Sequence, residues 1–332
     1  MEDGKYEMSI RIPTDADGLL ARECPRDDCS PGYFKVKPGT GLSGQETDFC
    51  PYCRAEAAPN KFTTKSQLKY ARDTVAAEAT EGVQRMVGDA LGLDASGRRR
   101  IGDGFLSIDI SVEQRPAAPV LPPIEDELRR DLTCLKCGLV HAVFGLATFC
   151  PDCGTDIFPS HVQAEIAVIR RMIESVDERR RELGARAAAR DLENALEDAV
   201  SVFEAALKAL LLRHFRGTGS EEEIEKSVRR SASYQDPTSA ADGFKKLTRI
   251  DLDPGPCAEL AKTFSKRHPI THNLGVVDRR YLERARTREL QGREIHVSVE
   301  EVEDALRLVE SILRDAHARL FPSSAGGAAA GD

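Results

Sequence analysis

Apolar side chains recur every three to four positions along most of the C-terminal half, and this is the spacing of one face of an α-helix. Ser220, followed by three glutamates, marks a further helix start, because a serine cap and acidic residues in the first turn both stabilise a helix N-terminus. Together these patterns predict an all-α bundle. The expected helices cover 161–183, 185–215, 241–248, 257–266 and 299–320.

The N-terminal half carries shorter patterns. Residues 33–37 are predicted to be extended within a loop-rich segment, and a helix capped by Thr63 or Thr64 is predicted to end near Leu91. Residues 105–113 then alternate between apolar and polar side chains, which predicts a half-buried strand. The predicted helix carries an apolar stripe of Leu68, Val75, Ala79, Val83, Met86, Val87 and Leu91.

Charge and composition limit the classes of function. The net charge is -8, so the protein as a whole does not attract nucleic acid, and any RNA contact must come from a local patch. The N-terminus lacks a basic segment followed by an apolar stretch, and no run approaches the roughly 18 apolar residues of a membrane span. We therefore expect a soluble, cytoplasmic protein without membrane contact. Thiols stay reduced in that compartment, so paired cysteines favour metal over disulfide.

Four cysteines near the middle of the chain form two close pairs, Cys134-x2-Cys137 and Cys150-x2-Cys153, separated by twelve residues. In such a pair a tight turn aims two thiolates at one point, and a glycine directly after each pair suits that turn. Four thiolates are the ligands that Zn²⁺ prefers in a closed tetrahedral site. The spacing therefore predicts a zinc ribbon.

A second candidate ribbon contains Cys24-x4-Cys29 and Cys50-x2-Cys53, the first pair being wider than usual. An internal repeat supports it, because the FCPYC around its second pair matches the FCPDC of the other candidate. Both zinc ions, two per chain, are expected to be structural, because four cysteine ligands leave no open coordination position. The ribbons then either bind nucleic acid or protein, or only hold the N-terminal half folded. Cys257 is left over as an ordinary buried or half-buried thiol.

The chemistry-bearing segment of the helical half runs through Arg267, His268, Pro269, Ile270, Thr271, His272 and Asn273 to Gly-Val-Val-Asp, which ends at Asp278. Here the sequence resembles the HEPN family, whose mark is an arginine, usually a polar residue, three more positions and a histidine. The preceding amphipathic stretch and the long upstream helix are also similar to that family, and the resemblance covers residues 185–320. Pro269 inside the motif departs from the expected pattern.

The resemblance implies an endoribonuclease that needs no metal ion, acts as a homodimer and serves in a toxin or antiviral role. The expected substrate is single-stranded RNA, cut by attack of the 2′-hydroxyl on the adjacent phosphate. His272 is expected to move a proton near neutral pH, and Arg267 to stabilise the developing negative charge on phosphorus. His268 or Asn273 is expected to orient the phosphate or the imidazole. An antitoxin or another protein partner is a further expectation.

Three other interpretations of the segment remain open. Arg267 and His272 also suit a buried polar cluster that fixes a helix start. His268 and His272, four positions apart, would share one face of a helix and suit a metal, although Pro269 disturbs that helix and no carboxylate lies nearby at ligand spacing. A HEPN domain also serves as a non-cleaving unit for RNA binding or dimerisation. In that case ribbons and bundle together form a module that binds nucleic acid or protein.

The expected fold class is mainly α, with a C-terminal HEPN-like helical bundle preceded by two small zinc-ribbon modules with short β elements. Five regions are predicted: ribbon 1 over 1–62, helix, strand and proline-rich linker over 63–123, ribbon 2 over 124–158, the bundle over 159–320 and a disordered tail over 321–332.

Overall fold

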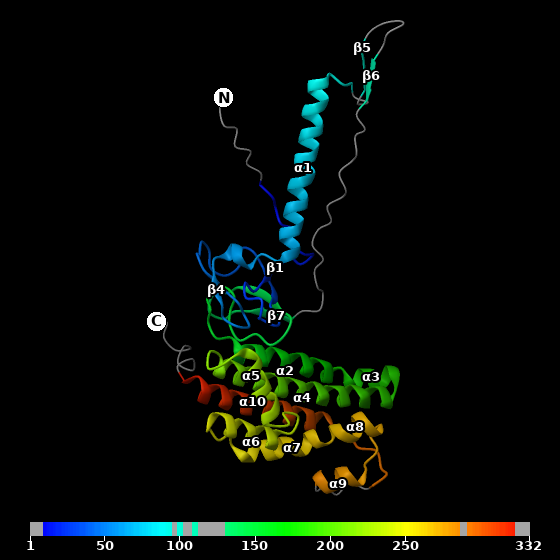
Figure 1. The fold of residues 1–332 in the computed structure, drawn as a ribbon. Coiled ribbons are helices and arrows are strands. Elements are labelled where there is room, and N and C mark those ends of the chain that lie inside the picture. The colour runs from blue at the N-terminus through cyan, green and yellow to red at the C-terminus, as the bar shows by residue number, and fades with distance from the viewer. Residues whose placement is uncertain (1–8, 95–97, 102–107, 112–129, 286–290, 323–332) are drawn as a thin grey trace. The chain divides into compact units, whose positions relative to one another are not determined.

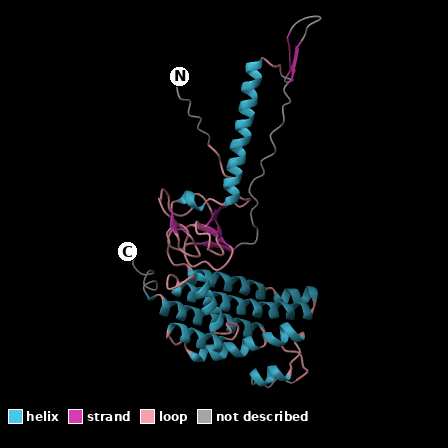
Figure 2. Cartoon of the chain, in the orientation of Figure 1, coloured by secondary structure: helices cyan, strands magenta, loops and turns pink. Residues whose placement is uncertain are grey.

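The structure, a computed structural model, describes all residues except 1–8, 95–97, 102–107, 112–129, 286–290 and 323–332. The fold is mainly helical, as expected, and its short strands lie in the N-terminal part (Figure 2). The chain divides into two compact units. The first, here called the cysteine unit, comprises 1–145 and 151–154, and the second, the helical unit, comprises 146–150 and 155–332.

A four-stranded antiparallel sheet organises the cysteine unit (Figure 1). Its strands, in spatial order, are β1 (Leu20–Glu23), β2 (Tyr33–Val36), β8 (Val140–Val143) and β7 (Arg130–Thr133). β2 confirms the predicted extended segment, and its Phe34 lies opposite Val143 of β8. The strands of the two predicted ribbons therefore share one sheet. A separate two-stranded sheet consists of β3 (Asp48–Phe49) and β4 (Glu56–Ala57).

The helix predicted after the first ribbon is confirmed as α1 (Lys65–Leu91), preceded by the 3-10 helix η1 (Pro59–Phe62). A capping box starts α1, in which the Thr64 hydroxyl accepts from the Gln67 amide and the Gln67 side chain accepts from the Thr64 amide. The Gln67 side chain also donates to the Ala21 carbonyl oxygen at 3.0 Å. These bonds fix the start of α1 against β1.

A two-stranded antiparallel hairpin follows α1. It consists of β5 (Arg98–Ile101) and β6 (Ile108–Ser111), so the strand predicted over 105–113 is present where the structure describes it. The predicted proline-rich linker lies outside the described residues, as does the tail from residue 323 onward.

The helical unit is built around its longest helix, α4, which contacts α2, α3, α5, α8 and α10. The helices are α2 (Phe158–Glu174), α3 (Val176–Leu183), α4 (Ala185–Phe215), α5 (Glu221–Ser231), α6 (Pro237–Thr248), α7 (Pro254–Ser265), α8 (Arg267–Asn273), α9 (Arg279–Ala285) and α10 (Val299–Leu320). Leu196, Phe203 and Leu210 of α4 are fully buried. Each such side chain stabilises the fold by about 1.5–3 kcal/mol relative to an exposed position.

Most predicted helices of this unit are present, but the helix expected over 161–183 is divided. α2 ends at Glu174 and α3 begins at Val176. Between them the Ser175 hydroxyl donates to the Met172 carbonyl oxygen at 2.8 Å. Because a serine side chain can compete for backbone groups in this way, the regular helical ladder is interrupted there. Ser220 caps α5 as predicted, accepting from the Glu223 amide.

An ionic cluster within the helical unit ties the chain before α2 to two other helices. The Asp156 carboxylate accepts from Nε2 of His317 on α10 at 2.9 Å and pairs with Arg213 on α4 at 2.7 Å. The Arg213 guanidinium lies 4.5 Å from the centre of the Phe149 ring and 3.9 Å from that of Phe321. The cluster thus joins residues that are more than 150 positions apart.

Because of this cluster, we expect part of the free energy of unfolding to be lost in acid. Burial raises the pKa of the Asp156 carboxyl, but the hydrogen bonds from His317 and Arg213 outweigh burial and lower the pKa to about 2 from 3.8. A depressed carboxyl pKa contributes stability above the unfolded value, and that contribution disappears as the pH falls from about 4 to about 2. At neutral pH, Asp156→Asn is expected to lower the free energy of unfolding by about 2 kcal/mol.

The measurement is urea unfolding of wild type and Asp156→Asn at several pH values. The difference between the two proteins is the quantity to follow, because loss of any bound metal in acid affects both. The difference should shrink steadily below pH 4. A difference that stays constant to pH 2 would contradict the assignment.

Candidate functional site

The first group of four predicted metal ligands converges in the cysteine unit. The sulfurs of Cys24, Cys29, Cys50 and Cys53 all lie within 4.8 Å of one another. The Cys24 and Cys53 sulfurs are 3.6 Å apart, and those of Cys29 and Cys50 are 3.8 Å apart. Four sulfurs placed tetrahedrally at 2.3 Å from a zinc ion are separated by about 3.8 Å. The geometry therefore fits a tetrahedral metal ion, despite the wider spacing of the first pair.

The second predicted group converges in the same way. The sulfurs of Cys134, Cys137, Cys150 and Cys153 lie within 4.8 Å of one another, with 3.8 Å between Cys134 and Cys153. Cys134 and Cys150 are buried, and the other two are half-buried. Both predicted sets of four cysteines are thus brought together, and each can hold one metal ion with sulfur ligands alone. Such a closed set offers no position for a reacting molecule.

Backbone geometry explains why these pairs point inward. In the second group the Gly138 amide donates to the Cys134 carbonyl oxygen at 2.9 Å, which closes the turn between Cys134 and Cys137. Gly138 and Gly154 have φ values of 77° and 61°, a left-handed conformation that glycine adopts without strain. In the first repeat the equivalent residue is Arg54, with φ of 60°, so the same turn is made there by a residue for which it is less favourable.

The two repeats also support each other through their fourth residues, Tyr52 in FCPYC and Asp152 in FCPDC. Tyr52, between Cys50 and Cys53, donates its hydroxyl to the Tyr33 carbonyl oxygen and accepts from the Phe144 amide of the second ribbon. Asp152, at the matching position, accepts from the Leu42 amide of the first ribbon at 2.6 Å. The two ribbons therefore stabilise each other reciprocally. Sequence reasoning found the repeat but not this role of its variable residue.

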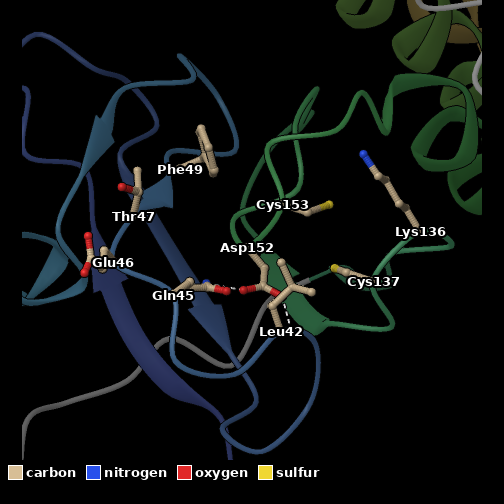
Figure 3. A pocket seen from close by; sticks show the side chains of 9 residues that line it. All are labelled: Leu42, Gln45, Glu46, Thr47, Phe49, Lys136, Cys137, Asp152 and Cys153. Carbon is tan, nitrogen blue, oxygen red and sulfur yellow. Dashed lines mark hydrogen bonds between the residues drawn. The ribbon is translucent and has the colours of Figure 1, made fainter.

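An open hollow of about 470 Å³ lies beside the second cysteine group (Figure 3). Asp152 is one of its lining residues and accepts from Gln45 as well as from Leu42, and Cys137 and Cys153 also line it. The carboxylate oxygens of Asp152 are already engaged by these donors. Residues of both ribbons line the hollow, so it lies where the two ribbons meet. The residues that line it are Leu42, Gln45, Glu46, Thr47, Phe49, Lys136, Cys137, Asp152 and Cys153.

The Arg267–His272 motif forms the short helix α8, which sequence reasoning did not predict. Pro269 is accommodated because it is the third residue of α8, where a helix amide has no intrahelical partner. The missing amide also separates α8 from α7, since it cannot bond to the Ser265 carbonyl oxygen. The expectation that Pro269 disturbs the helix shared by His268 and His272 is therefore wrong, because both histidines lie on α8 and the break falls before it, between α7 and α8.

Helix geometry decides which motif residues lie together. Arg267 and His272 are five positions apart, which separates them by about 140° around α8. His268 and His272 share a face, and their ring centres are 5.1 Å apart. Arg267 and His268 are half-buried, whereas His272 and Asn273 are exposed. One α8 helix therefore pairs the two histidines, and Arg267 points elsewhere.

The contacts of the motif residues are specific. Arg267 donates to the Gln235 side-chain oxygen at 2.7 Å, and Thr271 donates to Glu197 of α4 at 2.6 Å. Asn273 donates to the Val276 carbonyl oxygen at 3.2 Å, so its side chain holds the turn after α8. Gln235 and Glu197 were missed by sequence reasoning, because they are 32 and 74 positions away from their partners and belong to no local pattern.

Charge distinguishes Arg267 from neighbouring cations. Lys266 pairs with Glu301 at 2.5 Å, and Arg186 pairs with Glu294 at 3.0 Å. The partner of Arg267 is the neutral amide of Gln235, and the described residues place no carboxylate within ion-pair distance of it. Its positive charge is therefore not neutralised locally, and it can pair with an anion such as a phosphate.

The structure places no third metal ligand of the described residues close to His268 and His272. Among the described residues, groups of three or more close histidine, cysteine or carboxylate ligands occur only at the two cysteine sets.

Within the described residues, no helix is long and apolar enough to cross a membrane. Comparison with protein-family models, with curated proteins and with solved structures finds no match to this chain.

Proposed function

We propose that the helical unit is a HEPN-type endoribonuclease that cleaves single-stranded RNA without a metal ion. The observation that carries the proposal is α8, a surface helix that pairs the exposed His272 with the half-buried His268 and holds an arginine whose charge no carboxylate of the described residues neutralises. The resemblance of residues 267–278 to the HEPN family supplies the reaction.

In the proposed reaction the ribose 2′-oxygen forms a bond to the adjacent phosphorus, and the bond from phosphorus to the 5′-oxygen breaks. His272 accepts the 2′-hydroxyl proton or supplies the proton that the leaving 5′-oxygen takes up, since an imidazole changes charge near neutral pH. Arg267 donates hydrogen bonds to the phosphate oxygens as negative charge develops. The products carry a 2′,3′-cyclic phosphate and a 5′-hydroxyl.

The separation of Arg267 and His272 by about 140° around α8 affects how many chains are needed to form the proposed active site. Because Arg267 and His272 of one chain point in different directions, a site assembled from two chains is the arrangement that we propose. His268, whose ring lies 5.1 Å from that of His272, then orients the imidazole or the phosphate. Asn273 acts indirectly, by holding the turn that follows α8.

We further propose that each set of four cysteines binds one structural zinc ion, two per chain. Zinc suits the all-sulfur ligand set, and it would stabilise the shared sheet rather than take part in the reaction. The ribbons then serve as recognition or regulatory modules for RNA, an antitoxin or another protein. A toxin or antiviral role in the cytoplasm, where thiols stay reduced, is consistent with this arrangement.

A second candidate function is a non-catalytic module that binds RNA or protein. The bond from Arg267 to Gln235 favours it, because that bond occupies part of the guanidinium and also suits a structural role. This candidate predicts RNA binding that depends on Arg267 but no change in the RNA.

The two candidates are separated by incubating the purified protein with labelled single-stranded RNA and with DNA of the same sequence. The enzyme is expected to cut RNA and leave DNA intact, because DNA lacks the attacking 2′-hydroxyl. Cleavage of both polymers would contradict the proposed reaction. RNA that is bound but remains whole would favour the binding module.

A further inference from the structure

The helix α1 leaves an apolar surface exposed along its whole length. It has 27 residues, and Gln67 at its start is its one buried residue among those described. The side chains of Leu68, Val75, Val83 and Met86 are between 43% and 65% exposed. A single exposed apolar residue needs no explanation, but a row of four on one helix marks an interaction surface.

These apolar residues lie on one stripe. At 3.6 residues per turn, Leu68, Val75, Ala79, Val83, Met86 and Ala90 fall within about 80° of arc around α1. The charged residues within the same arc are Lys65 and Arg72, both near the N-terminal end. Their long aliphatic stems can cover apolar surface while the charge stays in water. The stripe is therefore continuous over about 35 Å of helix.

The charges of α1 are divided between its two halves. The N-terminal half carries Lys65, Lys69 and Arg72 against Asp73 alone, and the C-terminal half carries three carboxylates against Arg85 alone. Those three carboxylates belong to Glu78, Glu81 and Asp89. The half that begins the helix is thus positive, and the half that ends it is negative.

This charge order is unfavourable for α1 by itself. The dipole of a helix favours acidic residues in the first turn and basic residues in the last, by about 0.3–1 kcal/mol each. α1 has no acidic residue in its first turn and no basic residue in its last. The following strand compensates only in part, through Arg99, which donates to the Leu91 carbonyl oxygen at 2.7 Å. The charge order therefore needs another explanation.

We propose that α1 associates with α1 of a second copy of this chain in antiparallel orientation. Antiparallel pairing places the positive half of each helix beside the negative half of the other, and it packs the two apolar stripes against each other. It also opposes the two helix dipoles favourably. The same surface serves both chains, as a two-fold symmetric interface requires. The partner is thus a second copy, because the charge pattern is complementary to itself.

This inference does not rest on RNA cleavage, since α1 belongs to the cysteine unit and contains no residue of the proposed reaction. It also differs from an association through α8. Substitutions in α1 and in α8 therefore distinguish the two.

The test is sedimentation of the full-length, metal-loaded protein over a range of concentrations. Wild type is expected to be a dimer at micromolar concentration. Val75→Lys combined with Val83→Lys places two charges on the stripe, and we expect the dissociation constant to rise by on the order of a hundredfold. The matched control, Ala77→Lys combined with Gln84→Lys, adds the same charge to the opposite side of α1 and should leave the dimer intact.

A pair of charge variants tests the complementarity itself. One variant carries Lys65→Glu, Lys69→Glu and Arg72→Glu, and the other carries Glu78→Lys, Glu81→Lys and Asp89→Lys. Each is expected to be monomeric alone, because both halves of its α1 then carry a net charge of the same sign, although Asp73 and Arg85 are unchanged. Mixing the two should restore a dimer of one copy of each, more weakly at high salt.

Three outcomes would overturn the proposal. These are a monomeric wild type whose helix content and metal content are normal, a Val75→Lys, Val83→Lys variant that remains dimeric, and two charge variants that stay monomeric on mixing. A dimer that survives the stripe substitutions but is lost in α8 variants would place the association in the helical unit instead.

Discussion

Replacing His272 with alanine is expected to abolish most RNA cleavage, by roughly 10²–10⁴-fold, while the helical unit stays folded. The side chain is exposed on α8, so its removal leaves no cavity and no buried polar group. The measurement is the initial rate of cleavage of labelled single-stranded RNA, with circular dichroism to follow the fold. His296→Ala is a matched control, because that exposed histidine contacts its surroundings through its backbone oxygen.

Substitution of Arg267 is expected to slow RNA cleavage as well. Arg267→Ala should lower the rate by a comparable factor, and Arg267→Lys should restore only part of it, because lysine lacks the planar fork of donors. Gln235→Ala frees the guanidinium and should change the rate far less. Arg229→Ala removes an exposed arginine from α5 and serves as the control. Full activity in both His272→Ala and Arg267→Ala would contradict the assignment of these residues.

The second large effect concerns the cysteines. Cys134→Ser removes one of four thiolates from the second group, and the protein is expected to lose that zinc ion and most of the order of the cysteine unit. Structural zinc in small domains contributes about 10–16 kcal/mol of apparent binding free energy, far more than any single contact in the sheet. Elemental analysis should give two zinc ions per chain for wild type and one or fewer for the variant.

The reciprocal bonds between the ribbons make this prediction sharper. Because Tyr52 and Asp152 each bond to the other ribbon, loss of one metal should also weaken binding of the second. Cys257→Ser is the control, since Cys257 is a buried thiol of α7, and its metal content should stay at two. A Cys134→Ser protein that retains two zinc ions and an unchanged fold would refute the assignment.

Local patterns predicted much of the fold. Thr64 and Ser220 each precede a helix that begins at the next residue, because a hydroxyl cap satisfies free amides wherever it occurs. The cysteine pairs were equally predictable, since two thiolates on one tight turn supply half of a tetrahedral zinc site. The structure brings all eight of these cysteines into the two expected groups.

Features that depend on distant partners were not predictable. The pairing of β2 with β8 joins Phe34 to Val143, and no local pattern encodes which strands become neighbours. The separation of Arg267 from His272 likewise follows from α8 being helical, which Pro269 made difficult to predict. The stripe on α1 predicted a helix correctly, yet periodicity alone does not show whether an apolar face is buried within its own chain.

The chemical nature of the RNA ends tests the central claim most directly. Purified wild type and His272→Ala are incubated with labelled single-stranded RNA in the presence of a magnesium chelator, and zinc retention is measured in the same samples. The account predicts that wild type alone cuts and that its products carry 2′,3′-cyclic phosphate and 5′-hydroxyl ends. Cleavage by both proteins, or products with 5′-phosphate ends, would contradict it.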